Sequence, residues 1–195
     1  MHYLRVLFPA LVLLVLSAFA AHAAESPRER NIVELHTNKG VIVVELNFDK
    51  APVTAANFRS YVEEGFYDGT VFHRVIPGFM IQGGGLTAKM VEKKTRPPIK
   101  NEAGNKLPND KYSVAMARTS DPHSATAQFF INTKDNGFLN HKAPSGNDWG
   151  YCVFGRVIGG KSVVDAVEKT PTRTLGPYEN VPAEPIVIEK AILRE

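Results

Sequence analysis

Short apolar and β-branched runs recur along the chain and predict a protein built mainly of β-strands. Residues 32–37 and 41–46 are rich in Val, Ile and Leu and flank an Asn-Lys-Gly turn at 38–40, which indicates a β-hairpin. Six further strands are expected at residues 70–75, 80–83, 113–116, 129–132, 152–157 and 186–193. Turn-rich loops separate most of these runs.

Two segments change from the strand period to the helical one. Within residues 51–64, Pro52 suits a first helical turn, apolar side chains recur at helical spacing, and Gly65 ends the pattern. A second helix is expected over residues 162–169, shortly after two glycines. Strands and helices in this order predict a β-rich barrel or sandwich.

The first 23 residues have the pattern of a cleavable signal peptide. Arg5 precedes an apolar run over residues 6–20, and the small-residue site Ala21-His22-Ala23 follows. The run is shorter than the roughly 20 residues of a membrane-spanning helix, although an uncleaved anchor is the alternative. We expect residues 1–23 to be removed and residues 24–195 to form one domain in the periplasm.

Composition narrows the chemistry that this domain can carry. The net charge is +3 and the basic residues are spread along the chain, so we expect no nucleic acid partner. The only cysteine, Cys152, lies in an apolar run and is expected to be a buried thiol. The histidines show no paired ligand spacing, so we expect no metal.

The third and fourth predicted strands, joined by a Pro-Gly turn, carry the most distinctive side chains. Strand alternation places Met80 and Gln82 on one face, opposite to Ile81. In a regular strand it would turn His73 away from both Phe72 and Arg74. The result is a shallow apolar surface with an arginine and a glutamine at its edge. An ordinary core hairpin with a solvated arginine is the alternative.

Four segments in succession resemble the signature of one family. They span residues 72–84, 113–118, 124–139 and 151–157, in the order and approximate spacing found in the cyclophilins, which are peptidyl-prolyl cis/trans isomerases. The resemblance extends from about residue 32 to 193 and is closest to cyclophilins of the bacterial periplasm. It implies a closed eight-stranded antiparallel barrel capped by two helices.

The implied activity is rotation about X-Pro peptide bonds, which would assist the folding of exported proteins. The barrier to this rotation is about 18–20 kcal/mol, because twisting the amide breaks its resonance. No bond is made or broken, so we expect neither a metal nor another cofactor. The expected partners are proline-containing segments of unfolded or folding exported proteins. We expect a monomer without stable membrane association.

The resemblance also assigns roles to individual residues. Arg74 is the implied catalytic residue, since its permanently charged guanidinium can donate hydrogen bonds to the amide as it twists. Gln82 would orient Arg74 and bind the substrate backbone. The implied substrate-binding residues are His73, Phe79, Met80, Gln82, Ala117, Arg118, Gln128, Phe130, Phe138, Leu139 and Tyr151.

Three positions depart from the pattern of many eukaryotic cyclophilins. Arg118 stands in place of asparagine, Phe138 in place of tryptophan, and Tyr151 in place of histidine. The backbone carries most of the role at the first position, whereas the other two alter a wall of the groove. We therefore expect weak cyclosporin binding and retained catalysis.

Two other functions would use the same surface. A peptide-binding module could hold proline-containing segments on Phe79, Phe130 and Phe138 without useful turnover, but binding alone would not demand Arg74. A chaperone would hold unfolded clients on exposed apolar surface, yet the sequence has no added domain or long amphipathic arm for this.

Overall fold

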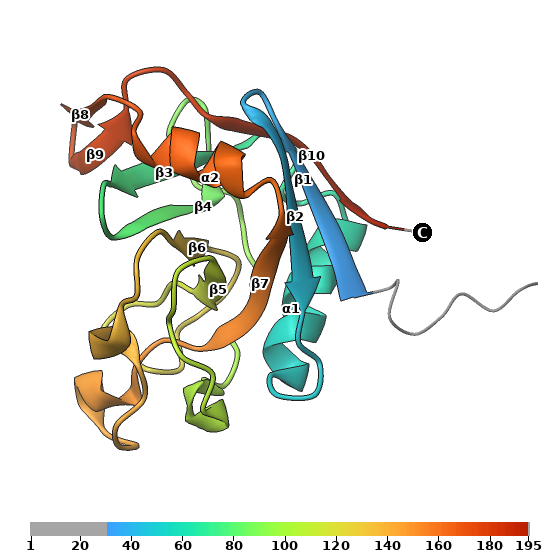
Figure 1. The fold of residues 1–195 in the computed structure, drawn as a ribbon, viewed down its shortest axis with the longest axis vertical. Coiled ribbons are helices and arrows are strands. Elements are labelled where there is room, and N and C mark those ends of the chain that lie inside the picture. Colours follow the sequence, from blue (N-terminus) through green and yellow to red (C-terminus); the bar gives the residue numbers. More distant parts are fainter. Residues whose placement is uncertain (1–30, 195) are drawn as a thin grey trace, which may run out of the picture.

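The computed structural model describes residues 31–194 and shows a closed antiparallel barrel of eight strands (Figure 1). The barrel strands are β1 Ile32–Thr37, β2 Gly40–Leu46, β3 Thr70–Ile76, β4 Met80–Thr87, β5 Ser113–Met116, β6 Phe129–Asn132, β7 Val153–Gly159 and β10 Val187–Leu193. Their order around the barrel is β1-β10-β3-β4-β6-β5-β7-β2. The implied barrel is confirmed, and the predicted signal peptide at residues 1–23 lies outside the described residues.

The last strand closes the barrel. β10 pairs with β1, where Leu35 lies opposite Ala191, and with β3, where Val71 lies opposite Val187. In β1 and β2 every second residue is buried, which is the pattern of strands with one face on a core. Both ends of the described chain therefore belong to one sheet.

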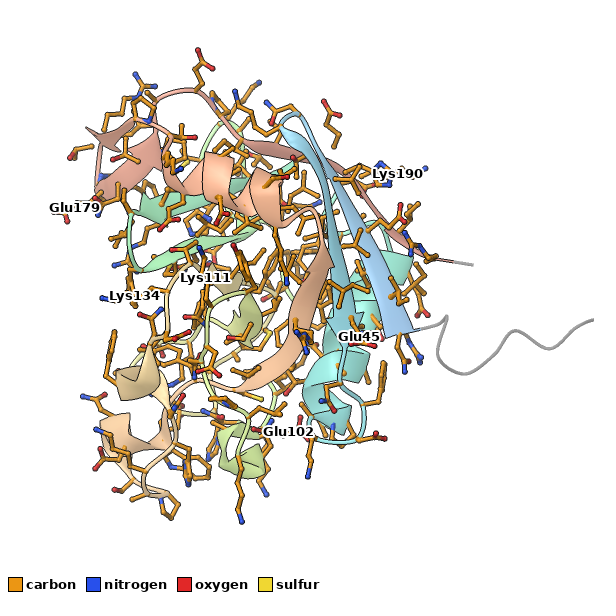
Figure 2. All side chains as sticks on the ribbon, in the orientation of Figure 1. Glu45, Glu102, Lys111, Lys134, Glu179 and Lys190 are labelled. Atoms are coloured by element: carbon orange, nitrogen blue, oxygen red, sulfur yellow. The ribbon has the colours of Figure 1, made fainter. Side chains whose placement is uncertain are left out.

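The first helix, α1 (Pro52–Glu63), begins at a proline. A side chain from a distant loop accepts hydrogen bonds from N–H groups of its first turn. The backbone N–H of Thr54 donates to a carboxylate oxygen of Glu102 at 2.8 Å, and that of Val53 donates to the other oxygen at 3.2 Å. Figure 2 labels Glu102 below the end of this helix. A carboxylate there also suits the positive end of the helix dipole.

Aromatic side chains fill the barrel interior under α1. The Phe58 ring lies 4.9 Å from Tyr67, 5.2 Å from Phe129 and 5.1 Å from Phe154, measured between ring centroids. All four side chains are fully buried. The predicted apolar stripe of α1 thus packs into the core.

The second helix, α2 (Lys161–Glu168), buries Val164 and Val167 and packs against β2, β3 and β4. It follows Gly160, whose φ of +72° requires a residue that tolerates the left-handed region. The bounds of α2 differ from the predicted ones by one residue at each end. Neither helix in residues 31–194 has the length and apolar character needed to cross a bilayer.

Outside the barrel, the chain forms a two-stranded sheet that the sequence pattern did not predict. It consists of β8 (Thr172–Leu175) and β9 (Tyr178–Pro182), and β9 lies beside β3 in Figure 1. All residues of β8 are exposed, so this strand has no buried face and no apolar alternation. Single 3₁₀ turns occur at Ala103–Asn105, Gly137–Leu139 and Gly146–Trp149.

Candidate active site

A β-bulge in β3 determines where Arg74 points. Phe72 pairs with Gly83 and Arg74 pairs with Gln82, so His73 is an extra residue between two adjacent partners on β4. Phe72 packs in the barrel core, whereas Arg74 is exposed outside it. His73 would face away from both neighbours only in a regular strand, and the bulge removes that condition, so that His73 and Arg74 line the same cavity. The extra residue breaks the regular alternation.

Arg74 begins a chain of polar side chains that crosses three segments. Its Nη1 donates a long hydrogen bond of 3.4 Å to Oε1 of Gln82, and Nε2 of Gln82 donates to Oε1 of Gln128 at 3.0 Å. Gly85 allows the close approach of Gln128, because a Cβ there would overlap the Gln128 side chain. Among the described residues Arg74 forms no other side-chain hydrogen bond, so its remaining donors are free to bind a substrate.

Beside Arg74 lies a separate apolar cluster outside the barrel core. Met80, which alternates with the core residue Ile81, joins Phe130 and Leu139 in this cluster. That outcome confirms the predicted alternation in β4. Gln82 lies opposite Phe130 in the sheet, so the polar chain runs along the edge of the cluster. The buried members of this apolar socket are Met80, Ala115, Phe130, Leu139 and Val153.

Aromatic side chains form the outer walls of the socket. Phe138 is 65 % exposed and stacks on Phe79, with centroids 5.7 Å apart and ring planes 24° apart. Tyr151 meets the Phe130 ring edge to face, with centroids 5.6 Å apart. The backbone N–H of Ala117 donates to the carbonyl of Gln128 at 3.0 Å. Aromatic rings at Phe138 and Tyr151 therefore border the socket.

Two of the predicted site residues are turned toward the protein itself. Nε of Arg118 donates to the carbonyl of Gly150 at 3.0 Å, and its guanidinium lies 4.6 Å from the Tyr151 ring. His73 is only 6 % exposed. Burial lowers the pKa of His73 to about 4, the Val71 backbone opposes this in part, and the neighbouring Arg74 charge adds to it. His73 is therefore neutral at pH 7.

A network of four asparagines, three of them buried, holds the loops around the socket and was not revealed by the sequence. Nδ2 of Asn136 donates to the carbonyl of Phe79 at 2.8 Å and to Oδ1 of Asn132 at 2.7 Å. Asn132 in turn donates to Asn109 at 3.2 Å, and Nδ2 of Asn109 donates to Oδ1 of Asn140 at 3.1 Å. Amide side chains can donate and accept at once, so four of them tie together the loops that carry the aromatic walls.

A second feature missed in the sequence is a cavity of about 420 Å³ next to Arg74. Arg74, Gln82 and Gln128 form one side of it, and residues 177–179 of the β8–β9 sheet form another. A larger cavity of about 680 Å³ contains none of the predicted site residues. The smaller cavity therefore extends the candidate site.

Thiol and metal chemistry have little support in the described part of the chain. The expected burial of Cys152 is confirmed at 3 % exposure, and that burial raises the pKa of its thiol to about 11. Within residues 31–194 no three His, Cys, Asp or Glu side chains are grouped so that they could hold a metal ion.

Comparison with known proteins adds independent information. Residues 32–192 match the family model described as cyclophilin type peptidyl-prolyl cis-trans isomerase/CLD. The chain is 60 % identical over 159 residues to peptidyl-prolyl cis-trans isomerase cyp18 of Streptomyces antibioticus, covering 82 % of this chain and 96 % of the relative. It is 52 % identical over 164 residues to peptidyl-prolyl cis-trans isomerase B of Escherichia coli, covering 84 % of this chain and 100 % of the relative.

A solved structure is similar over most of the fold. The Cryptosporidium parvum cyclophilin type peptidyl-prolyl cis-trans isomerase, crystallised in the presence of the dipeptide Ala-Pro, matches with a TM-score of 0.69 and 26 % identity. The match covers 84 % of this chain and 99 % of that protein.

Proposed function

The chain belongs to the cyclophilin-type peptidyl-prolyl cis-trans isomerases, and we propose that Arg74 and its adjoining socket catalyse X-Pro rotation in exported proteins. The observation that carries this proposal is the position of an exposed guanidinium at the edge of a buried apolar socket. The socket takes the proline ring and leaves the rotating amide next to Arg74.

The chemistry follows from the change in the amide as it twists. The proline nitrogen becomes pyramidal and regains its lone pair, and the carbonyl loses conjugation. A donor fixed near that nitrogen gains a hydrogen bond only in the twisted state, so it lowers the barrier and does not merely tighten binding. Arg74 supplies this donor, and Gln82 and Gln128 hold its direction.

The socket has a complementary role. The socket holds the proline ring on one side of the rotating bond through Met80, Phe130 and Leu139. The peptide on the other side of the bond can then rotate while the proline ring stays fixed. The stacked pair Phe79 and Phe138 covers the ring from outside. No step requires a nucleophile.

The test is the Arg74→Ala variant of the mature chain in a protease-coupled proline-isomerisation assay. We expect kcat/KM to fall roughly 10²-fold or more, as for loss of one preorganised donor. Arg156→Ala is the matched control, since Arg156 is an exposed arginine on the barrel strand β7 outside the socket. Circular dichroism should show both variants folded. An Arg74→Ala protein with near-parent activity would refute the catalytic assignment.

The same variant separates catalysis from simple peptide binding. If the surface serves only to hold peptides, the parent would bind a proline peptide without accelerating its exchange. We expect instead that Arg74→Ala keeps most of the peptide affinity, because the socket is intact, and loses turnover. Line-shape or exchange NMR on one labelled X-Pro peptide measures both quantities in a single sample.

The exported location rests on the predicted signal peptide at residues 1–23. We expect cleavage after Ala23 and recovery of the mature chain from the periplasm of a Gram-negative host. N-terminal sequencing of the purified protein measures this directly. Membrane-bound material that still begins at Met1 would contradict it.

A further inference from the structure

We propose that the 420 Å³ cavity beside Arg74 is a specificity subsite that takes a basic side chain flanking the isomerised proline. The cavity is lined by His73, Arg74, Gln82, Leu86, Glu92, Gln128, Pro177, Tyr178 and Glu179. This inference rests on the proposed function, because it assigns the segment next to the proline to this cavity.

The two carboxylates of the cavity stand on well-defined backbone. Glu92 is bridged to Leu86 across a tight loop, in which the N–H of Thr87 donates to the carbonyl of Val91 at 2.9 Å. Glu179 lies on β9, just after a two-residue turn at which Leu175 pairs with Tyr178. Figure 2 labels Glu179 at the outer end of the β8–β9 sheet, next to β3.

The charge balance of the lining favours a cation. Glu92 and Glu179 outweigh the single guanidinium of Arg74, and His73 is neutral at pH 7. Lys93 follows Glu92 in sequence but is directed elsewhere, since its Nζ donates to the carbonyls of Phe66 and Asp68 and lies over the Phe66 ring. Two acidic side chains in one cavity attract a lysine or arginine and repel an acidic residue.

The walls suit the rest of such a side chain. Leu86 and Tyr178 offer apolar surface to the methylene stem, while the polar head reaches the carboxylates. His73, which is 6 % exposed, lines the cavity, and its Nδ1 has no hydrogen-bond partner among the described residues. Unpaired buried polar atoms are uncommon in native proteins, which marks this edge of the cavity as unusual.

The distance along β4 sets which residue can enter. Gln82, placed beside the rotating amide in this proposal, lines the near end of the cavity. Leu86, which is bridged to Glu92, lines it four residues further along β4, up to roughly 13 Å away. An extended peptide advances about 3.3–3.6 Å per residue, and a lysine side chain adds its own length. The residue that fits is therefore about two or three positions from the proline.

The experiment compares peptides that carry Lys, Gln or Glu two or three positions from the proline, on either side. We expect the parent to favour Lys over Glu by about tenfold in kcat/KM at low salt, at one of these positions. In the double variant Glu92→Gln, Glu179→Gln this ratio should fall below about twofold. Glu189→Gln, an exposed glutamate on β10 that does not line the cavity, is the control and should keep the parent ratio.

The outcomes separate the subsite from the proposed function. Turnover of the Gln peptides tests the isomerase, and the Lys-to-Glu ratio tests the subsite. Should turnover be absent, Kd values for the same peptides from fluorescence anisotropy give the same ratio. Equal values for Lys and Glu at every position, a preference for Glu, or a Lys preference that survives the double variant would each overturn the subsite.

Discussion

Acidification should destabilise this protein through His73. The histidine is 6 % exposed, and burial lowers its pKa from 6.5 to about 4. The unfolded chain therefore takes up a proton near pH 6.5, whereas the native protein does so only near pH 4. Between these values the unfolded state holds more protons, so the free energy of unfolding falls as the pH falls. The contribution of neutral His73 to the free energy of unfolding is fully present above pH 6.5.

The size of the effect follows from the shift. Each pKa unit corresponds to about 1.36 kcal/mol, so a shift of some two and a half units lowers the free energy of unfolding by about 3 kcal/mol between pH 7 and pH 4. That is a large part of the roughly 5–15 kcal/mol typical of a folded domain. Other groups titrate in the same range, notably Glu34, whose pKa is lowered by its hydrogen bond to Arg194. A variant must therefore isolate His73.

Urea unfolding of the parent and His73→Gln at pH 7, 5.5 and 4 supplies that comparison. Glutamine cannot titrate, so the variant should lose about 3 kcal/mol less than the parent over this range. His141→Gln, in the loop that contacts Trp149, controls for the loss of an imidazole as such. NMR titration of the His73 ring provides a direct reading. Parallel pH curves for parent and His73→Gln, or a His73 pKa above about 6, would refute the burial argument.

Three further predictions concern the socket and the thiol. Asn136→Ala removes one of the two donors to the Phe79 carbonyl, which keeps the backbone N–H of Thr133, and it leaves the buried Oδ1 of Asn132 without its donor. We therefore expect a loss of about 1–3 kcal/mol in urea unfolding and a raised KM for proline peptides. An unchanged KM would mean that the network is not needed for the socket. Cys152 should react with a coloured thiol reagent only after the protein unfolds. With a pKa of about 11, roughly one thiol in 10⁴ is ionised at pH 7. Rapid reaction of the native protein would contradict the burial of Cys152. Phe138→Trp should strengthen inhibition by cyclosporin about ten-fold to a hundred-fold with little change in turnover. The reason is that the indole adds an N–H donor and contact area at an exposed position. Equal inhibition of both proteins would assign drug sensitivity to Tyr151 or Arg118.

Strands of the barrel could be predicted because their sequences indicate which side chains are buried. In β1 the buried Val33 and Leu35 alternate with partly buried residues, and in β4 Met80 and Ile81 turn to opposite sides as expected. Closure of the eight strands came from the resemblance to cyclophilins, since alternation does not distinguish a barrel from a sandwich.

Other features leave no such pattern. The bulge at His73 inserts one residue, and a single insertion in a short run cannot be told from regular alternation. The β8–β9 sheet has an exposed strand with no apolar face. The asparagine network joins residues 109 and 140, which meet only after the barrel has formed. Their spacing in the sequence therefore gives no indication of the network. Each of these features shapes the candidate site.

The position of β10 has a consequence for the order of events during biosynthesis. β10 fills the gap between β1 and β3, and the ion pair between Glu34 and Arg194 joins residues 160 positions apart. A nascent chain emerges from its N-terminus, so the barrel stays open at this seam until β10 has been synthesised. Pairing over such a separation is also slow, because loop-closure entropy is lost before the contacts form. A peptidyl-prolyl isomerase thus closes its own barrel only when β10, which is synthesised after the seven other barrel strands, is available.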